Sequence, residues 1–436
     1  MRLLCLSLAA LMALAANGMA QAPKPKPAPT AVEPATVEST QAALLAPFHK
    51  ALNDLEAGRR QRVVVLQIGD SHTHADHFTQ ALRERLQSRF GNAGRGHMPT
   101  AYSYPDYNPY GVRIQKTGNW TLMNARREDD AGPFGIAGFR LIGNNAADSI
   151  SLAADLPFDE AEIEILAQPG GGSFTVSVDG AALGEVSTNA NAVQMRRVPL
   201  KLDRPGQSLS VAPRGNGSVE LLGWSIWQRQ RGVALVSHGV SGATAAIMER
   251  FDPAIAAQEV ALLDPALIVI AFGTNEGFSM TFQHDAYRQQ FAARLAEWRR
   301  IAPNAALVVV GPPNALRVPD FCGSAGQRDR MACAAPPAQT AAAYYNLLGQ
   351  RSRLLCRWHE PGPQIEARAI QRQEAARAKA LFWDWSQIPA GPCGMDAWAR
   401  RNPPFVHKDR VHMRPEGYAL GGDALYKELM RSYRPR

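Results

Sequence analysis

Residues 63–73 read Val-Val-Val-Leu-Gln-Ile-Gly-Asp-Ser-His-Thr, an apolar run that ends in a Gly-Asp-Ser turn. The apolar part has the composition of a strand buried on both faces of a parallel sheet. Apolar residues then recur at the spacing of one helical face: Phe78, Leu82, Leu86 and Phe90. The stretch therefore predicts a strand, a turn and a helix, with Ser71 at the turn. An α/β enzyme presents a nucleophilic hydroxyl at such a turn, and the alternative role for Ser71 is a helix N-cap.

A serine becomes a nucleophile only when a base takes its proton and an acid orients that base. Residues 408–415 read Lys-Asp-Arg-Val-His-Met-Arg-Pro, so Asp409 precedes His412 by three positions. Pro415 favours the start of a helix, which puts both side chains on a short loop. We expect His412 to be the base and Asp409 the orienting acid. The alternative is a solvated loop with a capping pair.

Two more segments carry candidate donors for an oxyanion. Residues 237–244 read Ser-His-Gly-Val-Ser-Gly-Ala-Thr, a strand exit with two glycines, and residues 270–276 read Ile-Ala-Phe-Gly-Thr-Asn-Glu, a strand that ends in an amide. A backbone N–H and the side-chain amide of Asn275 are the donors that a tetrahedral oxyanion needs. Alternatively, Asn275 only satisfies a carbonyl at the end of the strand.

In this order the four segments resemble the SGNH (GDSL-like) hydrolase family. The Ser, Gly, Asn and His blocks of that family correspond here to Ser71, Gly242, Asn275 and His412. One block alone occurs by chance in many proteins, but four in order, three of them after predicted strands, are specific. Gly239 competes with Gly242 for the same role.

Within this family the chain looks most like the peptidoglycan O-acetylesterases of Gram-negative bacteria. The likeness rests on Gly-Asp-Ser-His-Thr at residues 69–73, Phe-Gly-Thr-Asn-Glu at 272–276 and Asp-x-x-His at 409–412, and it covers nearly all of residues 40–436. It implies an enzyme that removes acetyl from the C6 hydroxyl of muramoyl residues. The expected partner is O-acetylated peptidoglycan or a related glycan.

The resemblance also implies a mechanism. Ser71 would attack the acetyl carbonyl while His412 takes its proton and Asp409 fixes the imidazole tautomer. The backbone N–H groups of Ser71 and Gly242 and the amide of Asn275 would receive the oxyanion. No metal or organic cofactor enters this scheme. Three alternatives stay open: an O-acetyltransferase, an acetyl esterase of xylan or another polysaccharide, and an inactive cell-wall-binding protein.

Several polar residues surround the predicted nucleophile. His72, His74 and His77 are crowded, but their spacing matches no usual ligand motif. We expect them to be polar surface or to contact substrate. Asp70 is expected to shape the turn.

The rest of the chain predicts a doubly wound sheet. Further apolar runs that fit parallel strands are residues 233–236, 267–272, 307–310 and, more weakly, 381–385. Most are followed by helical patterns, as at residues 282–301. Strands alternating with helices indicate a parallel sheet flanked by helices. The family resemblance implies, more specifically, a flavodoxin-like, three-layer α/β/α fold.

Between residues 117 and 230 the helical periodicity stops and short alternating runs replace it, which predicts a β-sandwich inserted between the first and second strands of the sheet. We assign residues 119–229 to this insert and residues 40–118 and 230–436 to the hydrolase domain. The resemblance likens the insert to a carbohydrate-binding module.

Aromatic residues gather in two places. Residues 91–111 carry four tyrosines that either line a substrate groove or pack the junction between domains: Tyr102, Tyr104, Tyr107 and Tyr110. The insert carries three tryptophans for which a core position is favoured over a sugar-binding platform: Trp120, Trp224 and Trp227.

The 436 residues, 46% of them hydrophobic, are enough for two domains with a normal core. Residues 1–20 hold one charge, Arg2, an apolar run and small residues at the cleavage spacing, which predicts a secretory signal peptide. Residues 21–39 read as a proline-rich linker. No later stretch is long enough to span a bilayer, so we expect an exported protein, and the resemblance implies a Gram-negative periplasm.

The net charge is +8, and +7 without Arg2. This excess of positive charge would favour binding to an anionic polymer such as a cell wall, although an excess of this size also simply keeps a protein soluble. Nucleic acid is not an expected partner, because no run of Lys and Arg interleaves with aromatic residues.

Four cysteines remain after signal cleavage: Cys322, Cys333, Cys356 and Cys393. An even count in an exported chain predicts two disulfides. Of the three possible connectivities we expect Cys322–Cys333 and Cys356–Cys393. The absence of Cys-x-x-Cys spacing argues against zinc at these cysteines.

Overall fold

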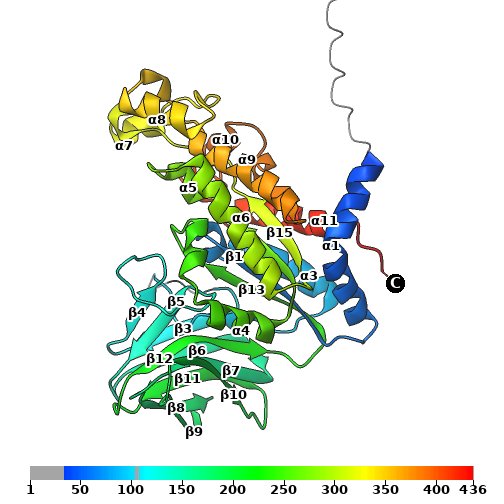
Figure 1. Cartoon of the computed structure of the whole chain (residues 1–436), viewed down its shortest axis with the longest axis vertical. Coiled ribbons are helices and arrows are strands. Elements are labelled where there is room, and N and C mark those ends of the chain that lie inside the picture. Colours follow the sequence, from blue (N-terminus) through cyan, green and yellow to red (C-terminus); the bar gives the residue numbers. More distant parts are fainter. Residues whose placement is uncertain (1–33, 104–106, 108, 436) are drawn as a thin grey trace, which may run out of the picture.

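The computed structural model describes residues 34–103, 107 and 109–435 (Figure 1). The predicted signal peptide at residues 1–20 lies outside the described residues, as does Tyr104. Helix α1 (Pro34–Glu56) begins within the predicted linker, so the last linker residues are helical. In the described ranges, no helix is both long and apolar enough to cross a membrane.

Five parallel strands form the predicted sheet. They are β1 (Arg62–Gly69), β13 (Gly232–Gly239), β14 (Pro265–Ala271), β15 (Ala306–Gly311) and β16 (Leu381–Asp384). Their order across the sheet is β13-β1-β14-β15-β16, which is the doubly wound order of flavodoxin-like folds. After β1 the chain continues on one side of that strand and then crosses to the other. The carboxyl ends of β1 and β14 therefore flank the switch point at which ligands bind in such sheets.

Helices cover both faces of this sheet (Figure 1). The first face carries α1, α3 (His77–Phe90) and α11 (Pro415–Met430), and the second carries α4 (Pro253–Leu263), α6 (His284–Ile301) and α9 (Gly362–Arg377). Strand β1 serves both layers, because Val63 and Val65 pack in the first and Val64 and Leu66 in the second. The predicted three-layer fold is confirmed, including the apolar face of residues 78–90.

An antiparallel β-sandwich is inserted between β1 and β13. One sheet has the order β10-β7-β12-β5-β4, with β2 also paired to β12, and the other has the order β3-β6-β11-β8-β9. The strands are β2 (Gly96–Met98), β3 (Val112–Thr117), β4 (Thr121–Asn124), β5 (Phe139–Gly143), β6 (Ser149–Phe158), β7 (Glu160–Ala167), β8 (Ser173–Val178), β9 (Ala181–Ser187), β10 (Gln194–Leu200), β11 (Gly206–Pro213) and β12 (Val219–Trp227). Strands β2 and β3 precede residue 119, so these sheets draw on the chain before that residue as well as after it.

The two antiparallel sheets share one core. Ile163 of β7 and Ile150 of β6 belong to the same buried cluster. Trp120, Trp224 and Trp227 are buried as well. They therefore belong to the protein interior, as expected, and they do not form an exposed sugar-binding platform.

The expected disulfide connectivity is wrong. The structure pairs Cys322 with Cys356, with Cα atoms 5.2 Å apart, and Cys333 with Cys393, with Cα atoms 5.8 Å apart. The reason is the short helix α7 (Ala325–Asp329), which lies between the first two cysteines in the chain. After this helix, Cys333 lies beside the carbonyl of Pro392, the residue before its disulfide partner Cys393.

Candidate active site

Ser71 lies at a tight turn between β1 and the four-residue helix α2 (Ser71–His74). Asp70 is the N-cap of α2, and its side chain accepts the backbone N–H of His72 at 3.0 Å. A side chain at Gly69 would collide with Ala271 of the neighbouring strand. Asp70 therefore shapes the turn as expected, and Ser71 is not the cap. Burial, aided by the nearby Glu276, raises the pKa of Asp70 to about 7.

A line of hydrogen bonds joins the three residues predicted for catalysis. The imidazole Nε2 of His412 lies 2.9 Å from Oγ of Ser71, although 341 positions separate them in the chain. The Nδ1 of the same ring lies 2.7 Å from Oδ2 of Asp409. The other carboxylate oxygen accepts the backbone N–H groups of Val411 at 2.9 Å and His412 at 3.1 Å. This geometry allows an imidazole to take a proton from a hydroxyl while a carboxylate holds the ring.

The loop that carries Asp409 and His412 is anchored by Arg410. This residue has a φ of +54° and its guanidinium is buried. It donates to Asp396 at 3.1 Å and also contacts Asp329. The loop ends where α11 begins at Pro415, as predicted. Arg410 was not identified from the sequence, because its partners lie on distant segments.

The hydrogen bond that the His412 ring donates to the carboxylate of Asp409 is the main cause that raises the pKa of His412, and the charge of Asp70 adds to it. Burial raises the pKa of Asp409, but the contact with His412 and the bond from the Val411 N–H outweigh burial and lower it. The side chains are 42% exposed for His412 and 45% for Asp409. The pair is therefore open to solvent on one side, where a large substrate could approach.

Gly242 and Gly239, the two candidates for a backbone oxyanion donor, have different surroundings. Gly242 has a φ of +77° in a turn closed by the Ala243 N–H, which donates to the Val240 carbonyl at 3.1 Å. Glycine is favoured there because it adopts a positive φ without the steric cost that a side chain would bring. Within the described ranges, no acceptor is found for the Gly242 N–H. Gly239, in contrast, ends β13, and a side chain there would collide with the backbone of His74.

Asn275 lies in the short helix α5 (Thr274–Phe278), directly after β14. Its side-chain amide donates to the Ala243 carbonyl at 2.8 Å. The carboxylate of Glu276 accepts the Ala245 N–H at 2.8 Å, and burial raises its pKa to about 7. These two hydrogen bonds connect the segment that follows β14 to the segment that contains Gly242. An amide has two N–H groups, so the second remains for an oxyanion.

His72 and His74 are buried and are not polar surface. The other expectation, contact with substrate, stays a prediction, and His74 lines the cavity that also contains Ser71. The Nδ1 of His72 lies 2.9 Å from the hydroxyl of Tyr418, and burial, with the charge of His412, lowers the pKa of His72 to about 3. The ring of His74 stacks on Tyr107 with centroids 4.2 Å apart. Both histidines are buried because α11 and the tyrosine-bearing loop cover α2. The local sequence around residues 72–74 does not indicate that these two distant segments pack there.

A cavity of about 360 Å³ lies over Ser71. Its lining includes Ser71, His77, Tyr107, Ser241, His412 and Tyr418. Tyr107 also lines a second cavity, of about 920 Å³, beside strands β3 and β4. The ring of Tyr102 packs against Phe139 of the sandwich. Tyr102 therefore packs at the domain junction, while Tyr107 borders the cavity over Ser71. That this cavity is a substrate groove stays a prediction.

Asp76 contacts both ends of the loop at residues 91–111, and its role could not be identified from the sequence. Its buried carboxylate contacts Arg83 at 2.9 Å and Arg95 at 3.0 Å, and accepts the Tyr110 N–H at 2.9 Å. Burial raises the pKa of Asp76, but the two guanidinium groups outweigh burial and lower it well below its usual range.

No model of a known protein family matches the sequence, and no curated protein matches it. Among solved structures, the chain is similar to a peptidoglycan O-acetylesterase, with a TM-score of 0.69 and 22% identity, over 89% of this chain and 97% of that chain. A family two carbohydrate esterase from Clostridium thermocellum matches with a TM-score of 0.28 and 14% identity, over 72% of this chain and 98% of that one. The second likeness is too distant to support an argument. The first confirms the fold over nearly the whole chain.

Proposed function

We propose that this protein is an exported serine esterase of the SGNH type that removes O-acetyl groups from peptidoglycan, at the C6 hydroxyl of muramoyl residues. The observation that carries the proposal is the hydrogen-bonded line from Ser71 through His412 to Asp409. The similarity to a solved peptidoglycan O-acetylesterase supports it. The two disulfides agree with a protein that folds in an oxidising compartment outside the cytoplasm.

The reaction begins when Oγ of Ser71 attacks the acetyl carbonyl as its proton passes to Nε2 of His412. Asp409 holds the ring in the tautomer that has Nε2 free and stabilises the imidazolium that forms. The N–H groups of Ser71 and Gly242 and the amide of Asn275 receive the oxyanion. His412 then protonates the departing sugar oxygen. The acetyl group is then bonded to Oγ of Ser71. A water attacks its carbonyl carbon while giving a proton to His412, and His412 passes that proton to Oγ as the Oγ–acetyl bond breaks and acetate leaves.

The surroundings of the site favour an acidic glycan. The cavity over Ser71 is small and open, which suits a short acyl group on a bulky polymer. The larger cavity that shares Tyr107 is lined by three cationic side chains, Arg113, Lys116 and Arg127. Peptidoglycan carries carboxylates that such cations attract. A neutral polymer such as acetylated xylan has no charge for them to bind.

The proposal is tested by measuring acetate release from O-acetylated peptidoglycan and from the same material after chemical deacetylation. We expect acetate only from the first, and faster release than from acetylated xylan at an equal concentration of ester. Faster release from xylan would overturn the choice of substrate. Formation of an acetylated acceptor glycan, with little free acetate, would make the protein a transferase.

Asn275→Ala should lower kcat on 4-nitrophenyl acetate by about 10²–10³, because the transition state loses one oxyanion donor. Asn275→Asp keeps the size of the side chain but removes the donor, so the kcat of this variant should fall by a similar factor. The melting temperature of each variant separates this effect from loss of the Ala243 contact. An unchanged kcat in folded Asn275→Ala would leave the amide with a structural role only.

A further inference from the structure

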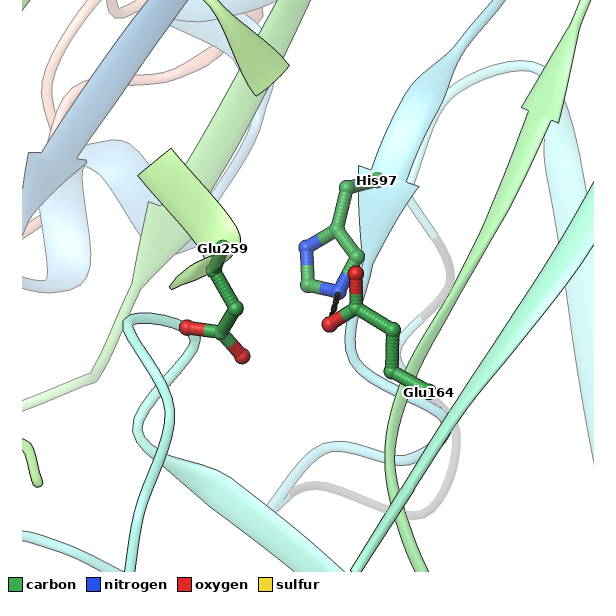
Figure 2. Close-up of side chains that lie close together, drawn as sticks. All are labelled: His97, Glu164 and Glu259. Carbon is green, nitrogen blue, oxygen red and sulfur yellow. Dashed lines mark ion pairs between the residues drawn. The ribbon is translucent and has the colours of Figure 1, made fainter. Parts of the chain in front are cut away.

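Three side chains that can ligate a metal converge where the sandwich meets the hydrolase domain (Figure 2). His97 comes from β2, Glu164 from β7 of the sandwich and Glu259 from α4 of the hydrolase domain. One ligand atom from each lies within 4.8 Å of the other two. The closest pair, Nε2 of His97 and Oε2 of Glu164, is 3.1 Å apart. None of the three residues lines the cavity over Ser71.

The cluster is closed to solvent, with exposed fractions of 1% for His97, 4% for Glu164 and 1% for Glu259. Within the part of the chain that the structure describes, Oε1 of Glu259 has no hydrogen-bond partner. The other oxygen accepts the Ile136 N–H at 2.6 Å. Two carboxylates so close together in a buried space repel each other unless a cation lies between them or one of them keeps its proton. The unsatisfied oxygen therefore marks a buried position at which a cation would be stabilised.

A second layer of contacts orients the ligands. Nδ1 of His97 lies 3.1 Å from Nε2 of His238, and this hydrogen bond turns the other nitrogen of His97 toward the carboxylates. Metal-bound histidines usually have such a partner on the second ring nitrogen. Two glycines leave the space open, because a side chain at Gly135 would collide with Glu259 and one at Gly223 with His97.

We propose that His97, Glu164 and Glu259 bind a divalent transition-metal ion, for which Zn²⁺ is the best fit, and that this ion fastens the inserted sandwich to the hydrolase domain. One imidazole nitrogen with two carboxylate oxygens is a donor set that zinc accepts. Calcium and magnesium prefer sets made of oxygen alone. A neutral imidazole and two carboxylates carry a charge of −2, which a divalent ion cancels. A water or a second carboxylate oxygen completes four ligands.

The test measures metal content in the full chain. Wild-type protein incubated with Zn²⁺ and dialysed should retain one zinc per chain by mass spectrometry of the metal, and its melting temperature should rise with added Zn²⁺. Glu259→Gln keeps an acceptor for the Ile136 N–H but loses a ligand charge, and Glu164→Gln loses the other. Each should weaken zinc binding by more than the about 10–100-fold that loss of an outer partner costs.

Glu162→Gln is the matched control, because Glu162 lies on the same strand and pairs with Arg197 outside the cluster. It should bind zinc as the wild type does. Circular dichroism and turnover of 4-nitrophenyl acetate show that each variant is folded. Wild-type protein that retains no zinc and shows no rise in melting temperature would overturn the proposal. Equal zinc retention by folded Glu164→Gln and Glu259→Gln would also overturn it.

Discussion

Replacing Ser71 with alanine should leave a folded protein whose kcat on 4-nitrophenyl acetate is lower by about 10⁶, as when the nucleophile of a comparable triad is removed. The loss is large because neither His412 nor the oxyanion donors can replace the bond that Oγ forms with the acyl carbon. Stability should change little, because Asp70 and not Ser71 caps helix α2. The melting temperature and the turnover of the same preparation check both statements.

Ser241→Ala is the matched control for this experiment. Ser241 lines the same cavity as Ser71, but the hydroxyl that lies within hydrogen-bond distance of Nε2 of His412 is that of Ser71. The control should therefore keep most of the activity. If Ser71→Ala kept its turnover while Ser241→Ala lost it, the nucleophile would have been assigned to the wrong serine.

Asp409→Asn should lower kcat by about 10⁴, because an asparagine amide facing Nδ1 favours the wrong imidazole tautomer. It should also change the pH profile. In the wild type, Asp409 raises the pKa of His412, and only the neutral ring can take the serine proton. Values of kcat/KM should therefore rise with pH through a midpoint above 6.5, the ordinary value for histidine.

The asparagine variant lacks the charge that raises this pKa, so the midpoint of its residual activity should move to lower pH. Asp423→Asn serves as a control, since that carboxylate lies on α11 and pairs with Arg85. It should keep the wild-type rate and midpoint. A folded Asp409→Asn protein with the wild-type rate and midpoint would remove Asp409 from the mechanism.

The parallel sheet could be predicted because each of its strands is a local apolar run. The residues that meet at the switch point could be predicted because short motifs mark the ends of β1 and β14 and the start of α11. Ser71 and His412 are in contact although they lie far apart in sequence. This contact does not follow from the order of the strands, because His412 lies on the loop before α11. It follows from the packing of α11 against α3, the helix that comes shortly after Ser71.

The features that could not be predicted depend on contacts between segments without a motif. The cysteine pairing follows from the path of α7, and the burial of His72 depends on Tyr418 of the last helix. The cluster of His97, Glu164 and Glu259 could not be predicted either, because its members come from three separate elements. No local spacing marks them as a set. Their common position follows only from how the sandwich meets α4.

The central claim is that His412 activates Ser71 as a nucleophile, and the most direct measurement is covalent labelling with diisopropyl fluorophosphate. The serine oxygen displaces fluoride from phosphorus, and mass spectrometry locates the adduct on a peptide. We predict one adduct per chain on the peptide that contains Ser71, formed far more slowly in folded His412→Ala. Labelling of another serine, or equal rates in the two proteins, would contradict the account.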